Sequence, residues 1–320
     1  NGEIYNYEEL RIQLKELGHV FKTNGDTEVL SRAIVEWGDS CVDKLDGMFA
    51  IALYDKKERT LLLARDTSGT KPLFWTQDKR GISFSSSLKS ILSLGYSRKL
   101  DRLGYKLYNE YGFVPGPKTL IEGINKLHVG QVIKFNLQDG RELYNRHVKF
   151  DYHQKEIEDF DYNNFRTEMG DAVRKCVMGK RQVGLYLSGG MDSGMILHEL
   201  SQFIDKPKTF TTRFQDTNNG RRTEFPTAGV NEDADVAKMM AKKYNTEHTE
   251  LFITNEMFIN AIDDTALALE EPRLNKNSPA YYLLNKELAR QGIVVTLSGD
   301  GGDEILTGYP RHHDVHNIPG

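Results

Sequence analysis

The pattern of apolar and polar positions over the first 150 residues predicts helices and β-hairpins. Apolar residues at helical spacing over 8–17 predict an amphipathic helix, and a second helix is expected from Asp26, which we interpret as its acidic N-cap. Pairs of apolar runs separated by short polar turns predict three hairpins, which are 48–54 with 60–64, 73–75 with 82–84, and 129–135 with 142–150. Hairpins mixed with helices are typical of an α+β domain with antiparallel sheets.

The pattern changes after residue 150. A polar, acidic stretch at 151–162 is interpreted as a linker. Beyond it, strands are expected at 182–187, 209–214, 248–252 and 293–297, and helices at 163–180, 193–204, 231–244, 255–268 and 279–292. Such alternation predicts an α/β domain with a doubly wound parallel sheet. The expected organisation is therefore one domain at 1–150 and a second at 163–320.

Composition narrows the classes of protein. The chain has 320 residues, of which 38% are hydrophobic and 28% charged, with a net charge of −4, as in ordinary globular proteins with two cores. The slight acidity and the lack of a basic run argue against nucleic-acid binding, and no apolar segment is long enough to predict a membrane span. Cys41 and Cys176 lack CxxC spacing, which argues against a zinc site or disulfide framework and fits the cytoplasm. Because the sequence opens at Asn1 without methionine, we expect a fragment of a longer protein.

The first chemical signal is the segment SGGMDS at 188–193, which lies between the apolar run 183–187 and a helical stretch. Its glycines allow a phosphate to approach the backbone, and Ser188 and Ser193 offer hydroxyl donors at the start of a helix. Asp192 would repel an anion unless a divalent cation lies between them, so the loop predicts Mg²⁺ bound together with phosphates. No lysine follows the glycines, which excludes the GxxxxGK[ST] loop. A glycine-rich turn without a ligand is the simpler explanation.

A second loop of the same kind follows the last predicted strand. Residues 298–304 read SGDGGDE and come directly after the apolar run 293–297. Since ligands bind at the carboxyl ends of parallel strands, we expect the two loops to share one ATP. Asp303 is then the second expected Mg²⁺ ligand, and Asp300 remains to act on the reacting centre. A flexible acidic turn and a calcium loop are the alternatives, but the spacing does not fit the EF-hand pattern.

Taken together, these motifs resemble those of glutamine-dependent asparagine synthetases. The matching stretches are NGEIYN at 1–6, NGDTEV at 24–29, DGMFAIALYD at 46–55, ARDTSGTKPLF at 64–74, YGFVPGPKTLIEGINKL at 111–127, SGGMDS at 188–193 and SGDGGDE at 298–304. The resemblance implies a class II glutamine amidotransferase domain of stacked antiparallel sheets, of the N-terminal-nucleophile hydrolase type, followed by an ATP-pyrophosphatase-type synthetase domain. It also implies that ammonia released from glutamine attacks an aspartate activated as an acyl-adenylate, with AMP and pyrophosphate as products.

The same resemblance implies roles for single residues. On the glutaminase side, Asn1 and Gly2 would form the oxyanion hole, and glutamine would be bound by Asn1, Gly2, Glu3 and Asp26. A turn at Asn1–Gly2 and a helix cap at Asp26 are the simpler explanations. On the synthetase side, ATP would be bound by Tyr186, Ser188, Gly189, Gly190, Asp192, Ser193, Thr212, Ser298 and Gly299. Asp300 matches an acidic position that manages the proton as ammonia attacks.

The sequence departs from the family at several positions. The nucleophilic cysteine is absent, so this polypeptide alone is expected to lack glutaminase activity, and Cys41 is expected to be a core residue. Tyr186 replaces a usual aliphatic residue, and Ser87 stands where an acidic residue is usual. Arg213 and the segment 215–222 form an unusual basic loop. This loop is either merely solvated or recognises an acceptor substrate other than aspartate.

Other functions therefore stay open at this point. The same machinery could act on another carboxylate, as in sugar-acid amidation or β-lactam-type cyclisation. A non-catalytic nucleotide-binding relative and a pure glutaminase are further alternatives. A pure glutaminase would leave the glycine-rich loops at 188–193 and 298–304 unexplained. The expected ligands are glutamine, aspartate or another carboxylate, ATP and Mg²⁺. The oligomeric state is left open, with a homodimer as one option.

Overall fold

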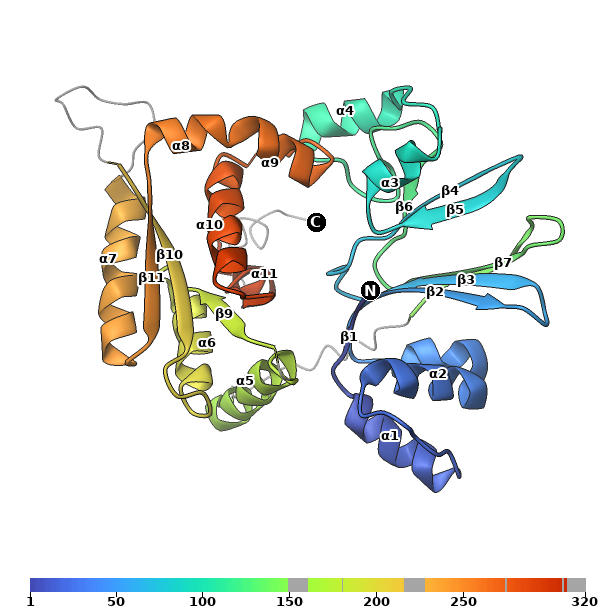
Figure 1. The fold of residues 1–320 in the computed structure, drawn as a ribbon, viewed down its shortest axis with the longest axis horizontal. Coiled ribbons are helices and arrows are strands. Elements are labelled where there is room, and N and C mark those ends of the chain that lie inside the picture. The colour runs from blue at the N-terminus through green and yellow to red at the C-terminus, as the bar shows by residue number, and fades with distance from the viewer. Residues whose placement is uncertain (149–160, 180, 216–227, 274, 307, 310–320) are drawn as a thin grey trace, which may run out of the picture. The chain divides into compact units, whose positions relative to one another are not determined.

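The computed structural model describes residues 1–148, 161–179, 181–215, 228–273, 275–306 and 308–309. The chain divides into two compact units (Figure 1). The first unit comprises Asn1–Glu158 together with Ala266–Leu274, and the second comprises Asp159–Thr265 together with Asn275–Gly320. No helix among the described residues is long and apolar enough to cross a bilayer.

Two antiparallel sheets form the centre of the first unit. The larger has the strand order β1-β2-β3-β7-β8 and the smaller has the order β5-β4-β6. The strands are β1 (Gly2–Ile4), β2 (Gly47–Asp55), β3 (Thr60–Arg65), β4 (Phe74–Asp78), β5 (Gly81–Ser85), β6 (Asn125–Lys126), β7 (Gln131–Asn136) and β8 (Glu142–His147). The helices are α1 (Tyr7–Glu16), α2 (Asp26–Trp37), the 3₁₀ helix η1 (Gly38–Lys44), α3 (Leu88–Ser93) and α4 (Arg102–Tyr111).

Strand β3 shows how the layers of this unit are stacked. Its residues from Thr60 to Ala64 are all buried, because both faces of the larger sheet are covered. Leu62 and Ala64 pack into a core with α1 and α2, which lie along one face of the sheet in Figure 1. Leu61 and Leu63 belong to a second core, against which Trp75 and Ile82 of the smaller sheet pack. The first unit is therefore an α+β structure with stacked antiparallel sheets, as predicted.

The second unit is built on a parallel sheet with the strand order β11-β10-β9-β12. The strands are β9 (Val183–Tyr186), β10 (Lys208–Phe214), β11 (Glu247–Ile253) and β12 (Val295–Leu297). The helices are α5 (Tyr162–Cys176), α6 (Met191–Leu200), α7 (Ala228–Lys243), α8 (Asn255–Asn260), α9 (Ile262–Leu269), α10 (Ser278–Arg290) and α11 (Gly302–Leu306). Leu185 and Leu187 pack against α5, α6 and α7, whereas Phe210 packs against α10 in a separate core. Helices on both faces make the sheet doubly wound, as predicted.

All three predicted hairpins are confirmed, since β2 pairs with β3, β4 with β5, and β7 with β8. The single helix predicted at 255–268 is wrong, because α8 ends at Asn260 and α9 starts at Ile262. Of the linker predicted at 151–162, residues 151–160 lie outside the described part of the chain. Asp161 accepts hydrogen bonds from the backbone N–H groups of Asn163 and Asn164, so it caps α5.

The interpretation of Asp26 as an N-cap is also wrong. Gly25 occupies the N-cap position of α2, and no side chain accepts a hydrogen bond there. The Asp26 carboxylate instead accepts a hydrogen bond from the backbone N–H of Ile4, with a distance of 3.1 Å. Asp26 is the first residue of α2 and still lies in the positive field at the N-terminus of the helix. Its carboxylate, however, binds the backbone of β1, which lies more than twenty residues earlier in the sequence.

Candidate functional site

The first candidate loop joins the end of β9 to the start of α6. The hydroxyl oxygens of Ser188 and Ser193 lie 3.0 Å apart, and the backbone N–H of Ser188 donates to the Ser193 hydroxyl at 3.3 Å. Gly190 is the N-cap of α6, and no side chain there accepts a hydrogen bond from the helix. The first-turn N–H groups of α6 are therefore not capped by a side chain, which is the arrangement that suits a phosphate.

Gly189 seats this loop against α7. Its φ of +81° lies in the left-handed region, and a Cβ at this position would lie 2.5 Å from the carbonyl oxygen of Asp233. The backbone N–H of Ala237 would be only 3.2 Å away. Since neither backbone atom can move without displacing α7, only glycine fits at this position.

The second candidate loop packs directly on the first. A Cβ on Gly299 would lie 2.8 Å from the Asp192 Cβ and 2.9 Å from the Ser193 nitrogen, and a Cβ on Gly302 would lie 2.6 Å from the Asp192 Cγ. The two glycines therefore allow the loop after β12 to approach Asp192 without any intervening side chain. Asp303 follows Gly302 directly in α11.

The two loops meet at a topological switch point of the sheet. Strands β10 and β11 continue outward from one edge of β9, while β12 pairs with the other edge, with Leu297 opposite Leu185. The direction of sheet growth therefore reverses between β9 and β12. Ligands of open α/β sheets bind outside the carboxyl ends of the strands at such a point.

Charge at this switch point favours a bound cation. Burial raises the pKa of Asp192, and the nearby carboxylates of Asp303 and Glu304 raise it further. Within the part of the chain that the structure describes, no group of three or more His, Cys, Asp or Glu residues could enclose a metal. Mg²⁺ fits this donor set, because it is usually held by one or two carboxylates together with phosphate oxygens and water.

An aromatic cluster lies beside the loops, on the α10 side of the sheet. The Tyr186 hydroxyl donates to the Asn285 side chain at 2.7 Å, and its ring meets Tyr281 edge-on with the centroids 6.1 Å apart. Burial raises the pKa of both tyrosines, and the negative charge of Asp300 adds to the rise. Asp300 is itself exposed. Tyr186 and Asp300 are thus close enough to interact electrostatically, whereas no described contact joins them to Thr212, which lies on β10 opposite Leu251.

Tyr281 and Asn285 were not predicted as site residues. They lie four positions apart in α10, where the sequence shows only ordinary helical periodicity. The one available signal was the unusual Tyr186, because a buried tyrosine hydroxyl needs a hydrogen-bond partner.

The residues predicted to bind glutamine gather around β1 in the first unit. Gly2 has a φ of +141°, and a Cβ there would lie 2.0 Å from the Met48 carbonyl oxygen. The Asn1 side-chain amide donates to the Ser86 hydroxyl at 3.4 Å. Glu3 is half-buried, and Asp26 lies beside the backbone of Ile4. The structure thus brings Asp26 to the segment 1–4, which carries the other three residues.

Comparison with known proteins shows the family. Residues 1–146 match the family model of a glutamine amidotransferase domain, and residues 164–318 match that of asparagine synthase. The chain belongs to the asparagine synthetase family.

Its relatives include glutamine-hydrolysing asparagine synthetase 3 of Bacillus subtilis, which is 30% identical over 98% of this chain and 52% of its own length. Synthetase 1 of the same species is 31% identical over 97% of this chain and 47% of its own length. A putative asparagine synthetase of Methanocaldococcus jannaschii is 31% identical over 98% of this chain and 58% of its own length. The chain thus spans about half the length of the curated relatives it matches.

In this asparagine synthetase relative, Arg213 is engaged in ion pairs. Its guanidinium lies 2.6 Å from the Asp235 carboxylate and 3.1 Å from that of Glu250. These two hydrogen-bonded carboxylates raise the pKa of Arg213 further, so its charge is already neutralised by α7 and β11. Arg213 is therefore already paired and does not supply an unpaired positive charge to the predicted basic loop. Its residues 216–222 lie outside the described part of the chain.

Cys41 is a core residue, as predicted. It is 1% exposed and packs in the core beneath α1 and α2. Burial, followed by the charges of Asp39 and Asp43, raises the pKa of its thiol to about 11. At neutral pH this thiol is almost entirely protonated, and a protonated thiol is a poor nucleophile.

We therefore expect Cys41 to resist alkylation in the native protein. Iodoacetamide at pH 8 should leave Cys41 unmodified, and the same treatment in urea should modify it fully, because unfolding exposes the thiol and restores its ordinary pKa. Peptide mass mapping of both samples measures the difference. Equal modification with and without urea would contradict the assignment of Cys41 to the core.

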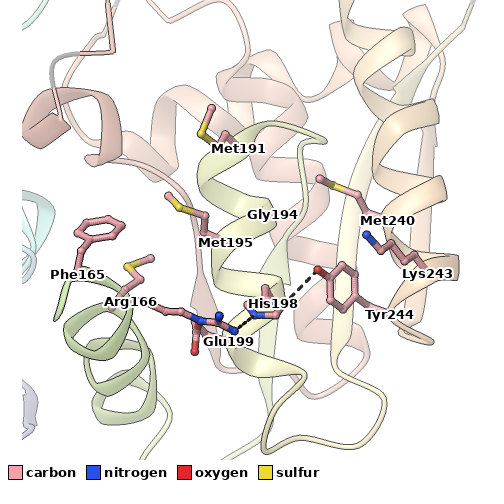
Figure 2. A pocket seen from close by; sticks show the side chains of 11 residues that line it. Phe165, Arg166, Met191, Gly194, Met195, His198, Glu199, Met240, Lys243 and Tyr244 are labelled. Carbon is pink, nitrogen blue, oxygen red and sulfur yellow. Dashed lines mark hydrogen bonds between the residues drawn. The ribbon is translucent and has the colours of Figure 1, made fainter. Parts of the chain in front are cut away.

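A cavity of about 510 Å³ lies between α5, α6 and α7 (Figure 2). Its apolar lining residues are Phe165 and the methionines Met169, Met191, Met195 and Met240. His198 accepts a hydrogen bond from Arg166 at 2.9 Å, and the Tyr244 hydroxyl lies 3.4 Å from its other ring nitrogen. Arg166, Lys243 and the Tyr244 hydroxyl also line the cavity, but no residue of the loops 188–190 and 298–304 does, so the cavity is separate from the expected phosphate site.

Proposed function

We propose that the protein amidates aspartate to asparagine, using ATP to activate the carboxylate and ammonia derived from glutamine. The observation that carries this proposal is the packing of two glycine-rich loops at the switch point between β9 and β12, with Asp192 pressed against the second loop. Adenylation requires a site that binds a triphosphate and stabilises the departure of pyrophosphate. Backbone amides, two serine hydroxyls and adjacent carboxylates supply the groups for that task.

In the proposed first step, a carboxylate oxygen of aspartate attacks the α-phosphorus of ATP, and pyrophosphate leaves. The N–H groups at the start of α6 and the hydroxyls of Ser188 and Ser193 hold the phosphates. Asp192 and Asp303 would hold Mg²⁺, which would offset negative charge on the phosphates. Tyr186, Thr212, Ser298 and Gly299 remain the proposed contacts of the nucleoside.

In the proposed second step, ammonia attacks the carbonyl carbon of the acyl-adenylate, and AMP leaves with the electron pair of the broken carbon–oxygen bond. The attacking nitrogen loses a proton as the amide forms. Asp300 is the proposed acceptor of that proton, since it is exposed beside the loop and interacts electrostatically with Tyr186 and Tyr281.

On the glutaminase side, the Asn1 amide and the Gly2 N–H are the proposed donors to the oxyanion that forms from glutamine. Glu3 and Asp26 are the proposed partners of its α-ammonium group. The bond from Ile4 N–H uses only part of the acceptor capacity of the Asp26 carboxylate, which leaves room for a second donor. The cytoplasmic location and the homodimer remain predictions.

The reaction is tested with the full-length protein, ATP, aspartate and glutamine labelled with ¹⁵N in the amide. We expect labelled asparagine, with AMP and pyrophosphate released in equal amounts. Release of ADP and phosphate would contradict adenylation. Formation of AMP only with a sugar acid or a β-amino acid in place of aspartate would support one of the alternative acceptors. The absence of any nucleotide cleavage would support a non-catalytic relative.

A further inference from the structure

The segment 266–274 lies in the synthase half of the sequence but packs within the first unit. It begins inside α9, which spans Ile262–Leu269. Glu270, the residue after this helix, has a φ of +63° in the left-handed region, although it is not glycine. Such a conformation persists only where the surroundings hold it, and it often marks a functional position. The contacts of Glu270 are therefore informative.

The Glu270 carboxylate is bound at the start of α3. One oxygen accepts a hydrogen bond from the Ser87 hydroxyl and the other accepts one from the backbone N–H of Leu88, both at 2.5 Å. The Lys89 ammonium lies 3.8 Å away, and it donates to the carbonyl of Leu267 at 2.8 Å. The Glu270 side chain is 14% exposed, so a largely desolvated carboxylate satisfies donors of the first unit.

Glu271 forms a second anchor next to the first. Its carboxylate lies 2.6 Å from the Lys126 ammonium and accepts a hydrogen bond from the backbone N–H of Leu120 at 3.2 Å. Both partners of this ion pair are mostly buried, with 19% of the Lys126 side chain and 11% of the Glu271 side chain exposed. Two consecutive acidic residues thus attach this part of the chain to the start of α3 and to Lys126 of β6.

The Glu270 anchor lies next to the proposed glutamine site. Ser86 directly precedes Ser87, and its hydroxyl accepts the hydrogen bond from the Asn1 side-chain amide at 3.4 Å. A side-chain amide nitrogen carries two hydrogens. This long, solvent-exposed hydrogen bond favours one plane of the Asn1 amide and so influences where the second hydrogen points.

We propose that Glu270 is a positioning residue for glutamine hydrolysis. By holding Ser87 and Leu88, it fixes the backbone at Ser86 and so orients the Asn1 amide toward the oxyanion. This inference rests on the proposed role of Asn1 in glutamine hydrolysis. It makes the amidotransferase site dependent on a short segment that the synthase half of the chain contributes.

The test uses the full-length protein and the variants Glu270→Ala, Glu270→Gln and Ser86→Ala. We expect Glu270→Ala to lower kcat for glutamine hydrolysis about tenfold, because a small misplacement of a catalytic donor is costly, with little change in KM. Glu270→Gln keeps one acceptor oxygen and should fall between Glu270→Ala and the wild type. Synthesis with ammonium chloride in place of glutamine should be unaffected. Glu122→Gln, at an exposed ion pair with Lys99 in the same unit, is the matched control.

A second measurement separates the anchor from its proposed role. Hydrogen exchange at the Leu88 amide should accelerate in Glu270→Ala but not in Ser86→Ala, while both variants show a lower kcat for glutamine hydrolysis. Unchanged exchange in Glu270→Ala would overturn the anchor. Faster exchange with full glutaminase activity, or equal loss of the glutamine- and ammonia-dependent reactions, would overturn the positioning role. If the wild type hydrolyses no glutamine, the proposed function fails, and the exchange experiment still reports on the anchor.

Discussion

Replacing Asp192 with asparagine should lower ATP-dependent amidation by the full-length protein about 10²- to 10³-fold without loss of folding stability. The activity falls because asparagine retains the shape of the side chain but removes the negative charge proposed to hold Mg²⁺. Formation of AMP and pyrophosphate, measured at saturating aspartate, reports this loss. Asp205→Asn, at an exposed position in the same unit, should leave the rate unchanged.

The stability of the same variant provides an independent check. The pKa of Asp192 is raised in the folded protein, so the ionised carboxylate lowers the free energy of unfolding at neutral pH. This destabilisation is absent below the ordinary carboxyl pKa of 3.8 and fully present above the raised value. Asp192→Asn removes it, so the melting temperature at pH 7 should be equal to or above that of the wild type. A lower melting temperature would attribute the lost activity to misfolding, and an active variant would refute the metal site.

Replacing Gly189 with alanine should destabilise the second unit by about 2–4 kcal/mol and abolish ATP binding. The added Cβ meets the Asp233 carbonyl at 2.5 Å, and the φ of +81° is unfavourable for alanine. Gly190→Ala is the matched control for stability, because its Cβ would meet only the Ser188 hydroxyl at 3.3 Å. We expect that control to change stability by less than about 1 kcal/mol.

Hydrogen exchange of the α6 amides is the suitable measurement for this pair. Both tryptophans of the chain, Trp37 and Trp75, belong to the first unit, so tryptophan fluorescence would not report on α6. The Gly189→Ala variant should exchange faster throughout α6, and Gly190→Ala should match the wild type. Equal protection of α6 in both variants would show that α7 accommodates the methyl group.

Local sequence patterns predicted most of the fold because hairpins and long helices are local structures. The hairpin between β2 and β3 has an apolar pattern on both strands and a short polar turn, so its pairing needed no distant information. By contrast, β1 has three residues and pairs with Gly47–Phe49, and nothing near Gly2 in the sequence indicates that partner. The break between α8 and α9 was missed because Ala261 marks it without a glycine or proline.

The nucleotide side of the candidate site was predictable for a similar reason. Each loop follows its own strand, and parallel strands place their carboxyl ends at one edge, so Asp192 and the loop after β12 could be expected to meet. The partners of Tyr186 and of Asp26 could not be predicted in this way. Asn285 and Ile4 contribute a side chain and a backbone N–H whose positions depend on how distant elements pack.

The anchored segment 266–274 also sets a rule for building chimeras between members of this family. A recombinant protein joined at residue 150 would combine the Ser87 and Lys126 of one parent with the acidic pair of another. To keep these contacts, a chimera would have to take Glu270 and Glu271 from the same parent as the amidotransferase half. More than a hundred residues separate that half from the acidic pair in the sequence. The exchange of amidotransferase domains between family members therefore requires two separate stretches of sequence to be transferred together, and a single crossover point is not enough.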